Sequence, residues 1–90
     1  MLKHFNIKII GQVQGIGFRY ASRQKALALG ITGSVRNEPD ESVSIEAEGE
    51  EKSLEKFIQW CQSGPSGAQI REVKVTDDAI KNFRDFLINY

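Results

Sequence analysis

Residues 31–48 read ITGSVRNEPDESVSIEAE, and this stretch decides the predicted fold. In residues 43–48 apolar and polar side chains alternate strictly, which is the period of a strand with one buried face. Residues 31–37 carry their apolar side chains on one parity, and Glu-Pro-Asp-Glu at 38–41 has the composition of a turn. The stretch therefore predicts a β-hairpin.

A helical period flanks this hairpin on both sides. Residues 18–29 predict one helix, with Gly30 as its C-terminal cap, and residues 51–62 predict another. Trp60 lies off the apolar stripe of the second helix and is expected to cover the rim of the core. The apolar positions are Phe18, Ala21, Ala26 and Leu29 in the first helix, and Leu54, Phe57, Ile58 and Cys61 in the second.

Outer strands complete the pattern. Residues 5–9 alternate with period two, residues 70–76 predict a fourth strand, and residues 86–90 predict an optional short fifth strand. The order β-α-β-β-α-β predicts an α+β fold of the ferredoxin-like, split βαβ type. Its two helices pack on one face of an antiparallel sheet.

Length and composition limit the possible functions. The 90 residues suit one domain, expected to span 1–90, with one modest core. Twelve Lys and Arg balance twelve Asp and Glu, which argues against binding to nucleic acid or to an anionic membrane. Cys61 is the only cysteine, so an internal disulfide is excluded, and we expect it in the core. The N-terminus resembles no signal peptide, and we expect a cytoplasmic protein.

Candidate chemistry lies between the first strand and the first helix. Residues 14–19 read Gln-Gly-Ile-Gly-Phe-Arg. Glycines there let successive backbone N–H groups converge on an anion at the positive end of the helix dipole. Arg19 adds a guanidinium that can bind two phosphate oxygens at once. The segment matches neither a Walker A loop nor a dinucleotide fingerprint. A glycine-rich turn with a surface arginine is the alternative interpretation.

Asn37 is a second candidate. It shares the parity of Ile31 and Val35, which predicts an amide at the strand end on the face toward the helices. A buried amide needs hydrogen-bond partners. An asparagine that initiates the turn before Glu38 is the alternative interpretation.

Two long blocks resemble a known family. The first is Gly11-x-Val13-Gln14-Gly15-Ile16-x-Phe18-Arg19, and the second is Leu29-Gly30-Ile31-x-Gly33-x-Val35-x-Asn37. Pro39-Asp40, Val43 to Gly49, Gly64-Pro65, Ala68 and Val73-x-Val75 continue the pattern. Over nearly its whole length the chain resembles the acylphosphatase family. The resemblance implies hydrolysis of the carboxyl-phosphate bond of acyl phosphates, without a metal, cofactor or covalent intermediate.

The resemblance also implies roles for single residues. Arg19 resembles the phosphate-binding arginine, Asn37 the asparagine that positions the attacking water, and Gln14, Gly15, Ile16, Gly17 and Phe18 the loop whose backbone amides hold the phosphate. Glu41 stands where members often have Gly after the turn, and Ser34 where many have Trp. Both departures concern the geometry around the turn more than the chemistry.

This chemistry needs few residues. The carboxylate leaving group has a conjugate acid with a pKa of about 4, so it departs without a proton. The loose transition state of phosphoryl transfer needs no strong base. Accordingly, His4 is expected at the surface, because its parity is opposite to that of residues 5, 7 and 9. Glu46 and Glu48 are expected to point outward into solvent.

Two other functions compete with this one. A non-catalytic phosphate-binding module would share the loop, although a chain that ends at Tyr90 without an extension favours a free-standing enzyme. We expect a monomer by default. An RNA-binding domain of the RRM type has the same element order, but its aromatic RNP1 residues lie on the third strand, where this chain has Ser44, Glu46 and Glu48. The residues leave the identity of the acyl group open, and we expect inorganic phosphate to inhibit.

Overall fold

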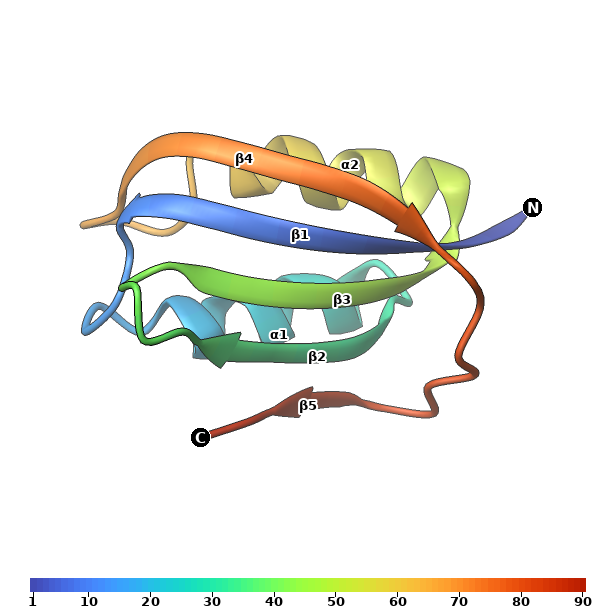
Figure 1. Ribbon diagram of the computed structural model, residues 1–90. Coiled ribbons are helices and arrows are strands. Elements are labelled where there is room, and N and C mark those ends of the chain that lie inside the picture. The colour runs from blue at the N-terminus through green and yellow to red at the C-terminus, as the bar shows by residue number, and fades with distance from the viewer.

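The computed structural model describes residues 1–90 as a five-stranded sheet with both helices on one face (Figure 1). Its elements are β1 (Leu2–Gln12), α1 (Phe18–Ala28), β2 (Thr32–Asn37), β3 (Val43–Glu50), α2 (Glu51–Cys61), β4 (Gln69–Asp78) and β5 (Phe86–Ile88). The predicted ferredoxin-like α+β fold is therefore confirmed.

The strands are ordered β4-β1-β3-β2-β5 across the sheet. The first four pair antiparallel with their neighbours, as predicted. The optional fifth strand is present and pairs parallel with β2, so the sheet is mixed. β5 reaches this edge through a crossover, residues 79–85, which passes around the end of the sheet opposite to the β2–β3 turn (Figure 1).

Element boundaries differ from the sequence predictions by a few residues. β1 begins at Leu2 because its first two residues pair with Glu50 and Gly49 of β3, and β4 extends to Asp78 because Asp78 pairs with His4 of β1. Each helix ends one residue earlier than predicted, since Leu29 and Gln62 are the residues that cap α1 and α2. Such differences at frayed ends do not alter the topology.

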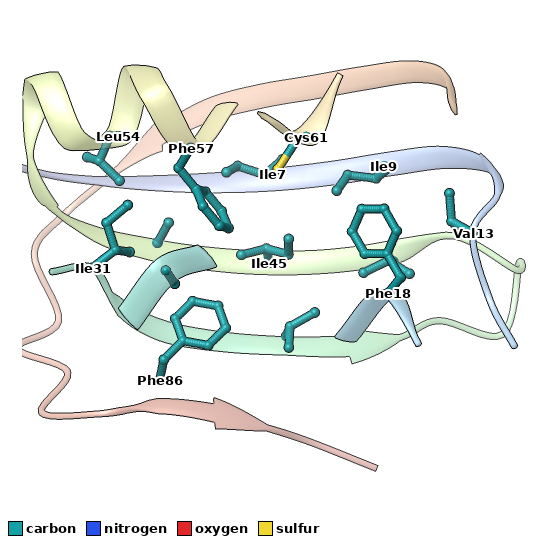
Figure 2. Close-up of a cluster of buried hydrophobic side chains, with 14 residues drawn as sticks. Ile7, Ile9, Val13, Phe18, Ile31, Ile45, Leu54, Phe57, Cys61 and Phe86 are labelled. Atoms are coloured by element: carbon teal, nitrogen blue, oxygen red, sulfur yellow. The ribbon is translucent and has the colours of Figure 1, made fainter. Parts of the chain in front are cut away.

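The core fills the space between the helices and the sheet (Figure 2). Phe18, Phe57 and Phe86 are its largest buried side chains. Burial of a side chain of this size stabilises the fold by about 1.5–3 kcal/mol. Cys61 is fully buried, as predicted, and burial raises the pKa of its thiol to about 12. Trp60 covers the rim of the core, as predicted, with its ring 5.6 Å from that of Phe18.

The predictions for His4 and Glu48 were wrong. Both side chains lie on the sheet face away from the helices, yet His4 is only 1% exposed and Glu48 only 6%. The parity of each strand was correct. Burial comes from the crossover, whose Phe83 ring stacks on the His4 ring at 5.9 Å. Strand periodicity cannot show that a later segment folds back over part of the outer face.

The two edges of the sheet are built differently. β5 covers the edge of β2 through three paired residues. β4 forms the opposite edge and is mostly exposed. Its charged side chains are Arg71, Glu72, Lys74, Asp77 and Asp78. Neither helix has the length and apolar composition that crossing a membrane requires.

Candidate active site

The loop between β1 and α1 has the backbone geometry of an anion-binding nest. Gly15 and Gly17 adopt φ values of +77° and +78°, in the left-handed region, while Ile16 between them has a negative φ. This alternation turns successive N–H groups toward one side of the loop. A Cβ added at either glycine would meet nothing within 4 Å, so the glycines serve backbone conformation rather than close packing.

α1 begins directly after this loop. Gly17 occupies the N-cap position, no side chain caps the helix, and its first turn contains no acidic residue. The first N–H groups of any helix lack partners within the helix, and they carry its partial positive charge. Arg19 lies in this first turn and is half-buried. The N-terminus of α1 is thus positive and has no anion of its own.

The Arg19 guanidinium is held by the residues that follow β5. Its Nη1 donates a hydrogen bond of 3.1 Å to the backbone oxygen of Asn89. Its Cζ also lies 4.8 Å from the centroid of the Tyr90 ring, within the range of a cation–π contact. Arg19 is therefore oriented before any substrate is bound, by a segment 70 residues away in the sequence.

Asn37 is the last residue of β2 and is half-buried. The turn that follows it is tied to the loop by Gln14, whose Nε2 donates hydrogen bonds of 2.9 Å to the backbone oxygens of Glu38 and Ser42. Gln14 thus couples the two segments that carry Arg19 and Asn37. The Gln14 side chain bonds to the turn, so only its backbone N–H can contribute to the nest.

The turn itself is fixed by Asp40. This carboxylate accepts a hydrogen bond of 2.7 Å from Lys8 Nζ and one of 3.0 Å from the backbone N–H of Ser42. The Lys8 and Ser42 hydrogen bonds hold the pKa of Asp40 well below its usual range. Glu41, the departure noted in the sequence, adopts a φ of +73°. The turn therefore keeps a left-handed residue where glycine would be favoured.

A cavity of about 190 Å³ brings the predicted residues together. Gly15, Gly17, Phe18, Arg19 and Asn37 line it, whereas the side chains of Gln14 and Ile16 turn to the β2–β3 turn and to the core. The sequence predictions missed Val13, Tyr20, Ile88 and Tyr90, which also line it. Ile88 and Tyr90 reach the site only because β5 pairs with β2, and no local pattern indicated that pairing.

A larger concavity of about 480 Å³ lies over the opposite, outer face of the sheet. Its lining includes neither Arg19 nor Asn37, and Arg36 and Lys81 there are already ion-paired with Glu38 and Glu46. Of these two cavities, only the smaller is lined by Arg19 and Asn37. No cluster of three or more His, Cys, Asp or Glu side chains is arranged to hold a metal ion.

Comparisons with known proteins agree with this geometry. The acylphosphatase family model matches residues 5–88. The acylphosphatase of Archaeoglobus fulgidus is 46% identical over 84 residues, which cover 93% of this chain and 94% of that protein. The acylphosphatase of Acaryochloris marina is 45% identical over 80 residues, 89% of this chain and 86% of that protein.

Solved structures show the same likeness. The crystal structure of acylphosphatase from Bacillus subtilis superposes with a TM-score of 0.95 at 33% identity, over the full length of both chains. Full-length HypF, solved in a phosphate- and nucleotide-bound form, superposes with a TM-score of 0.94 at 35% identity. This chain covers only 12% of HypF. The chain belongs to the acylphosphatase family, and it is an enzyme that hydrolyses acyl phosphates.

Proposed function

We propose that Arg19 and the backbone amides of residues 14–18 bind the phosphoryl group of an acyl phosphate, and that Asn37 orients the attacking water. One observation carries this proposal: Arg19, Asn37, Gly15 and Gly17 line a single cavity of about 190 Å³ at the N-terminus of α1. An anion placed there meets a guanidinium, converging N–H groups and the positive end of a helix dipole.

The chemistry asks little more of the protein. The leaving carboxylate needs no proton, because the pKa of its conjugate acid is about 4. The transition state is loose, so positioning and charge stabilisation supply most of the rate enhancement. Arg19 and the loop amides stabilise the charge on the equatorial phosphoryl oxygens. Metal-independent hydrolysis is thus the simplest mechanism for these residues.

Asn37 has the chemistry to orient water but not to deprotonate it. An amide oxygen accepts a hydrogen bond and an amide nitrogen donates one, yet neither takes a proton at neutral pH. Asn37 lies on β2, across the cavity from the loop, and the Gln14 hydrogen bonds fix its turn against that loop. We assign Asn37 to aligning a water with the P–O bond. The proton then passes to a substrate oxygen.

The acyl group lies toward the apolar side of the cavity. Tyr20, Ile88 and Tyr90 line that side, and Arg19 is the only charged residue of the lining. Tyr20 and Tyr90 are exposed to solvent. An open, apolar wall accepts acyl groups of different sizes, and inorganic phosphate, which shares the phosphoryl site, inhibits as a product.

Residues 1–90 act as one domain in this proposal, as a cytoplasmic monomer without a cofactor. A non-catalytic phosphate-binding module is the alternative function. The structural likeness to a small part of HypF, solved with phosphate and nucleotide, favours that alternative enough to test it.

The deciding experiment is hydrolysis of benzoyl phosphate by the purified protein in excess EDTA, with Arg19→Ala and Asn37→Ala in parallel. Turnover in EDTA that both substitutions abolish supports the enzyme and the two roles. Wild-type protein that is protected from unfolding by phosphate, but that does not turn over, supports the binding module. Turnover that disappears in EDTA contradicts the metal-independent mechanism.

A further inference from the structure

Glu48 is a buried carboxylate on the outer face of the sheet, at the end opposite to the cavity. Its oxygens accept hydrogen bonds from the backbone N–H groups of Lys81 and Phe83, the latter at 3.0 Å, and contact His4 Nδ1 at 2.8 Å. Burial of Glu48 opposes its ionisation, but the hydrogen bonds from Lys81, His4 and Phe83 together lower its pKa. A buried charge held this way resists displacement.

His4 holds Glu48 in place. The Nε2 atom of the histidine ring lies 3.2 Å from Asn6 Oδ1 and 3.2 Å from Glu46 Oε1, and Asn6 in turn donates to Asp78. The ring is therefore fixed at both nitrogens, with Phe83 stacked on one face. Glu48, His4 and Glu46 bind the crossover through two of its backbone N–H groups and through the side chains of Phe83 and Lys81.

The crossover leads directly into β5. Only Arg84 and Asp85 separate the anchored Phe83 from Phe86, the first residue of β5. β5 has three residues, paired in parallel with β2. A strand this short specifies its register weakly by pairing alone. Burial of Phe86 fixes which face points inward, so the position of β5 along β2 depends on what anchors its ends. At its start, the Gly33 N–H donates to the Asp85 oxygen and Arg23 Nε donates to the Phe86 oxygen, directly after the residues that Glu48 holds.

The far end of β5 reaches the cavity. The Asn89 N–H donates to the Val35 oxygen at 2.9 Å, and the Asn89 oxygen accepts from Arg19 Nη1 at 3.1 Å. The Tyr90 ring lies beside the same guanidinium. A shift of β5 along β2 would move the two groups that orient Arg19.

We propose that Glu48, held by His4, is a positioning residue for the phosphate site, acting through the crossover and β5 on Arg19. The inference rests on the phosphate-binding role proposed for Arg19. Glu48 touches neither substrate nor reacting atoms. It fixes where Asn89 and Tyr90 stand, and they fix the guanidinium.

Glu48→Gln tests the proposal against the matched control Glu46→Gln. Both substitutions remove one negative charge from the same strand and the same histidine. Glu46 contacts the crossover only through the exposed Lys81 Nζ, whereas Glu48 accepts two of its backbone N–H groups. We expect Glu48→Gln to weaken phosphate affinity and raise KM by about 2- to 30-fold, with a smaller change in kcat, and Glu46→Gln to leave phosphate affinity near wild type. Equal effects of the two variants would overturn the proposal.

A double-mutant cycle supplies a readout that a merely structural role would not give. Asn89→Pro removes the N–H that bonds to Val35 and so displaces the carbonyl that holds Arg19, whereas Asn89→Ala keeps both backbone contacts. If Glu48 acts through Asn89, the effect of Glu48→Gln on phosphate affinity is small in the Asn89→Pro background and full-sized in the Asn89→Ala background. Full additivity with Asn89→Pro would contradict the proposal.

Phosphate affinity is measured by protection against thermal unfolding, so the test does not require turnover. If the wild-type protein does not hydrolyse acyl phosphates, the proposed catalysis is wrong, but phosphate affinity can still be measured. If Arg19→Ala leaves phosphate affinity unchanged, the proposed role of Arg19 is wrong. If Glu48→Gln does not fold, His4→Phe takes its place, because it keeps a ring against Phe83 but removes the contact to Glu48. Wild-type phosphate affinity in that variant would overturn the proposal.

Discussion

The two helices are each eleven residues long, yet their N-termini are built in opposite ways. α2 begins with Glu51, an acidic residue in its first turn, whose N–H bonds to the backbone oxygen of Met1 at 3.2 Å. Neither helix has a side-chain cap, but α1 begins after two left-handed glycines, has no acidic residue in its first turn, and carries Arg19 there. In α2 the partial positive charge of the helix N-terminus is balanced by groups of the chain itself. In α1 no group of the chain balances it.

This difference separates a structural helix end from a functional one. α2 uses its own carboxylate and a neighbouring carbonyl, which stabilise the helix. α1 gives up such stabilisation, and the loop before it directs N–H groups and a guanidinium to the place where an anion would be favoured. A ligand phosphate thus replaces what Glu51 and Met1 supply in the other helix.

Removal of the charge that distinguishes α1 gives the largest expected effect. Arg19→Ala should lower kcat/KM for benzoyl phosphate by about 100- to 1,000-fold, because a preorganised donor to the transition state is lost. Steady-state kinetics and thermal protection by phosphate measure it. Lys25→Ala, in the last turn of α1, is the matched control for loss of a helix cation, because Arg23 donates to the Phe86 oxygen of β5 and is not independent of the site. Comparable losses in both variants would contradict the special role of Arg19.

Asn37 provides a second test of the difference between the two helix ends, because it lines the cavity at the N-terminus of α1. Asn37→Ala should lower kcat by about 100-fold through misalignment of the water, while phosphate affinity stays within twofold of wild type. Rate measurements at saturating substrate, paired with phosphate binding, separate the two quantities. Asn37→Ala with full kcat would remove Asn37 from the mechanism.

Making α1 resemble α2 should weaken the site without breaking it. Tyr20→Glu places a carboxylate in the first turn of α1, where it competes with phosphate for the same positive end. We expect phosphate affinity to fall roughly two- to fivefold, with more loss at low than at high ionic strength. Tyr20→Gln removes the same ring without the charge, and an equal loss there would show that the ring, not the charge, matters.

The smallest effect is expected at α2. Glu51→Gln should lower the free energy of unfolding by about 0.3–1 kcal/mol and leave kcat/KM unchanged. Denaturant unfolding measures it, with Glu55→Gln, further along the same helix, as the control. A change in phosphate affinity in Glu51→Gln would show that the two helix ends are not independent.

Periodicity was enough to predict the element order, the core of α2 and the faces of β2 and β3. The local signal of residues 14–19, with the resemblance, indicated the loop, Arg19 and Asn37, and the structure brings them to one cavity; their roles stay predictions. The contacts made by the crossover, β5 and the two residues after it could not be predicted. The burial of His4 and Glu48 and the contacts of Asn89 and Tyr90 all depend on the crossover that brings β5 beside β2. Neither the hydrophobic period nor the composition of turns indicates where the crossover and β5 pack against the sheet.

The edges of the sheet determine whether copies of this protein associate through their strands at high concentration. An uncovered strand edge offers its backbone groups to another chain and so can seed aggregation. On one side β5 occupies the partner positions of residues 33–35 of β2. On the other side, β4 surrounds its free backbone groups with charges of both signs. The strand that brings Tyr90 to the candidate active site therefore also helps to keep the protein from polymerising through its sheet.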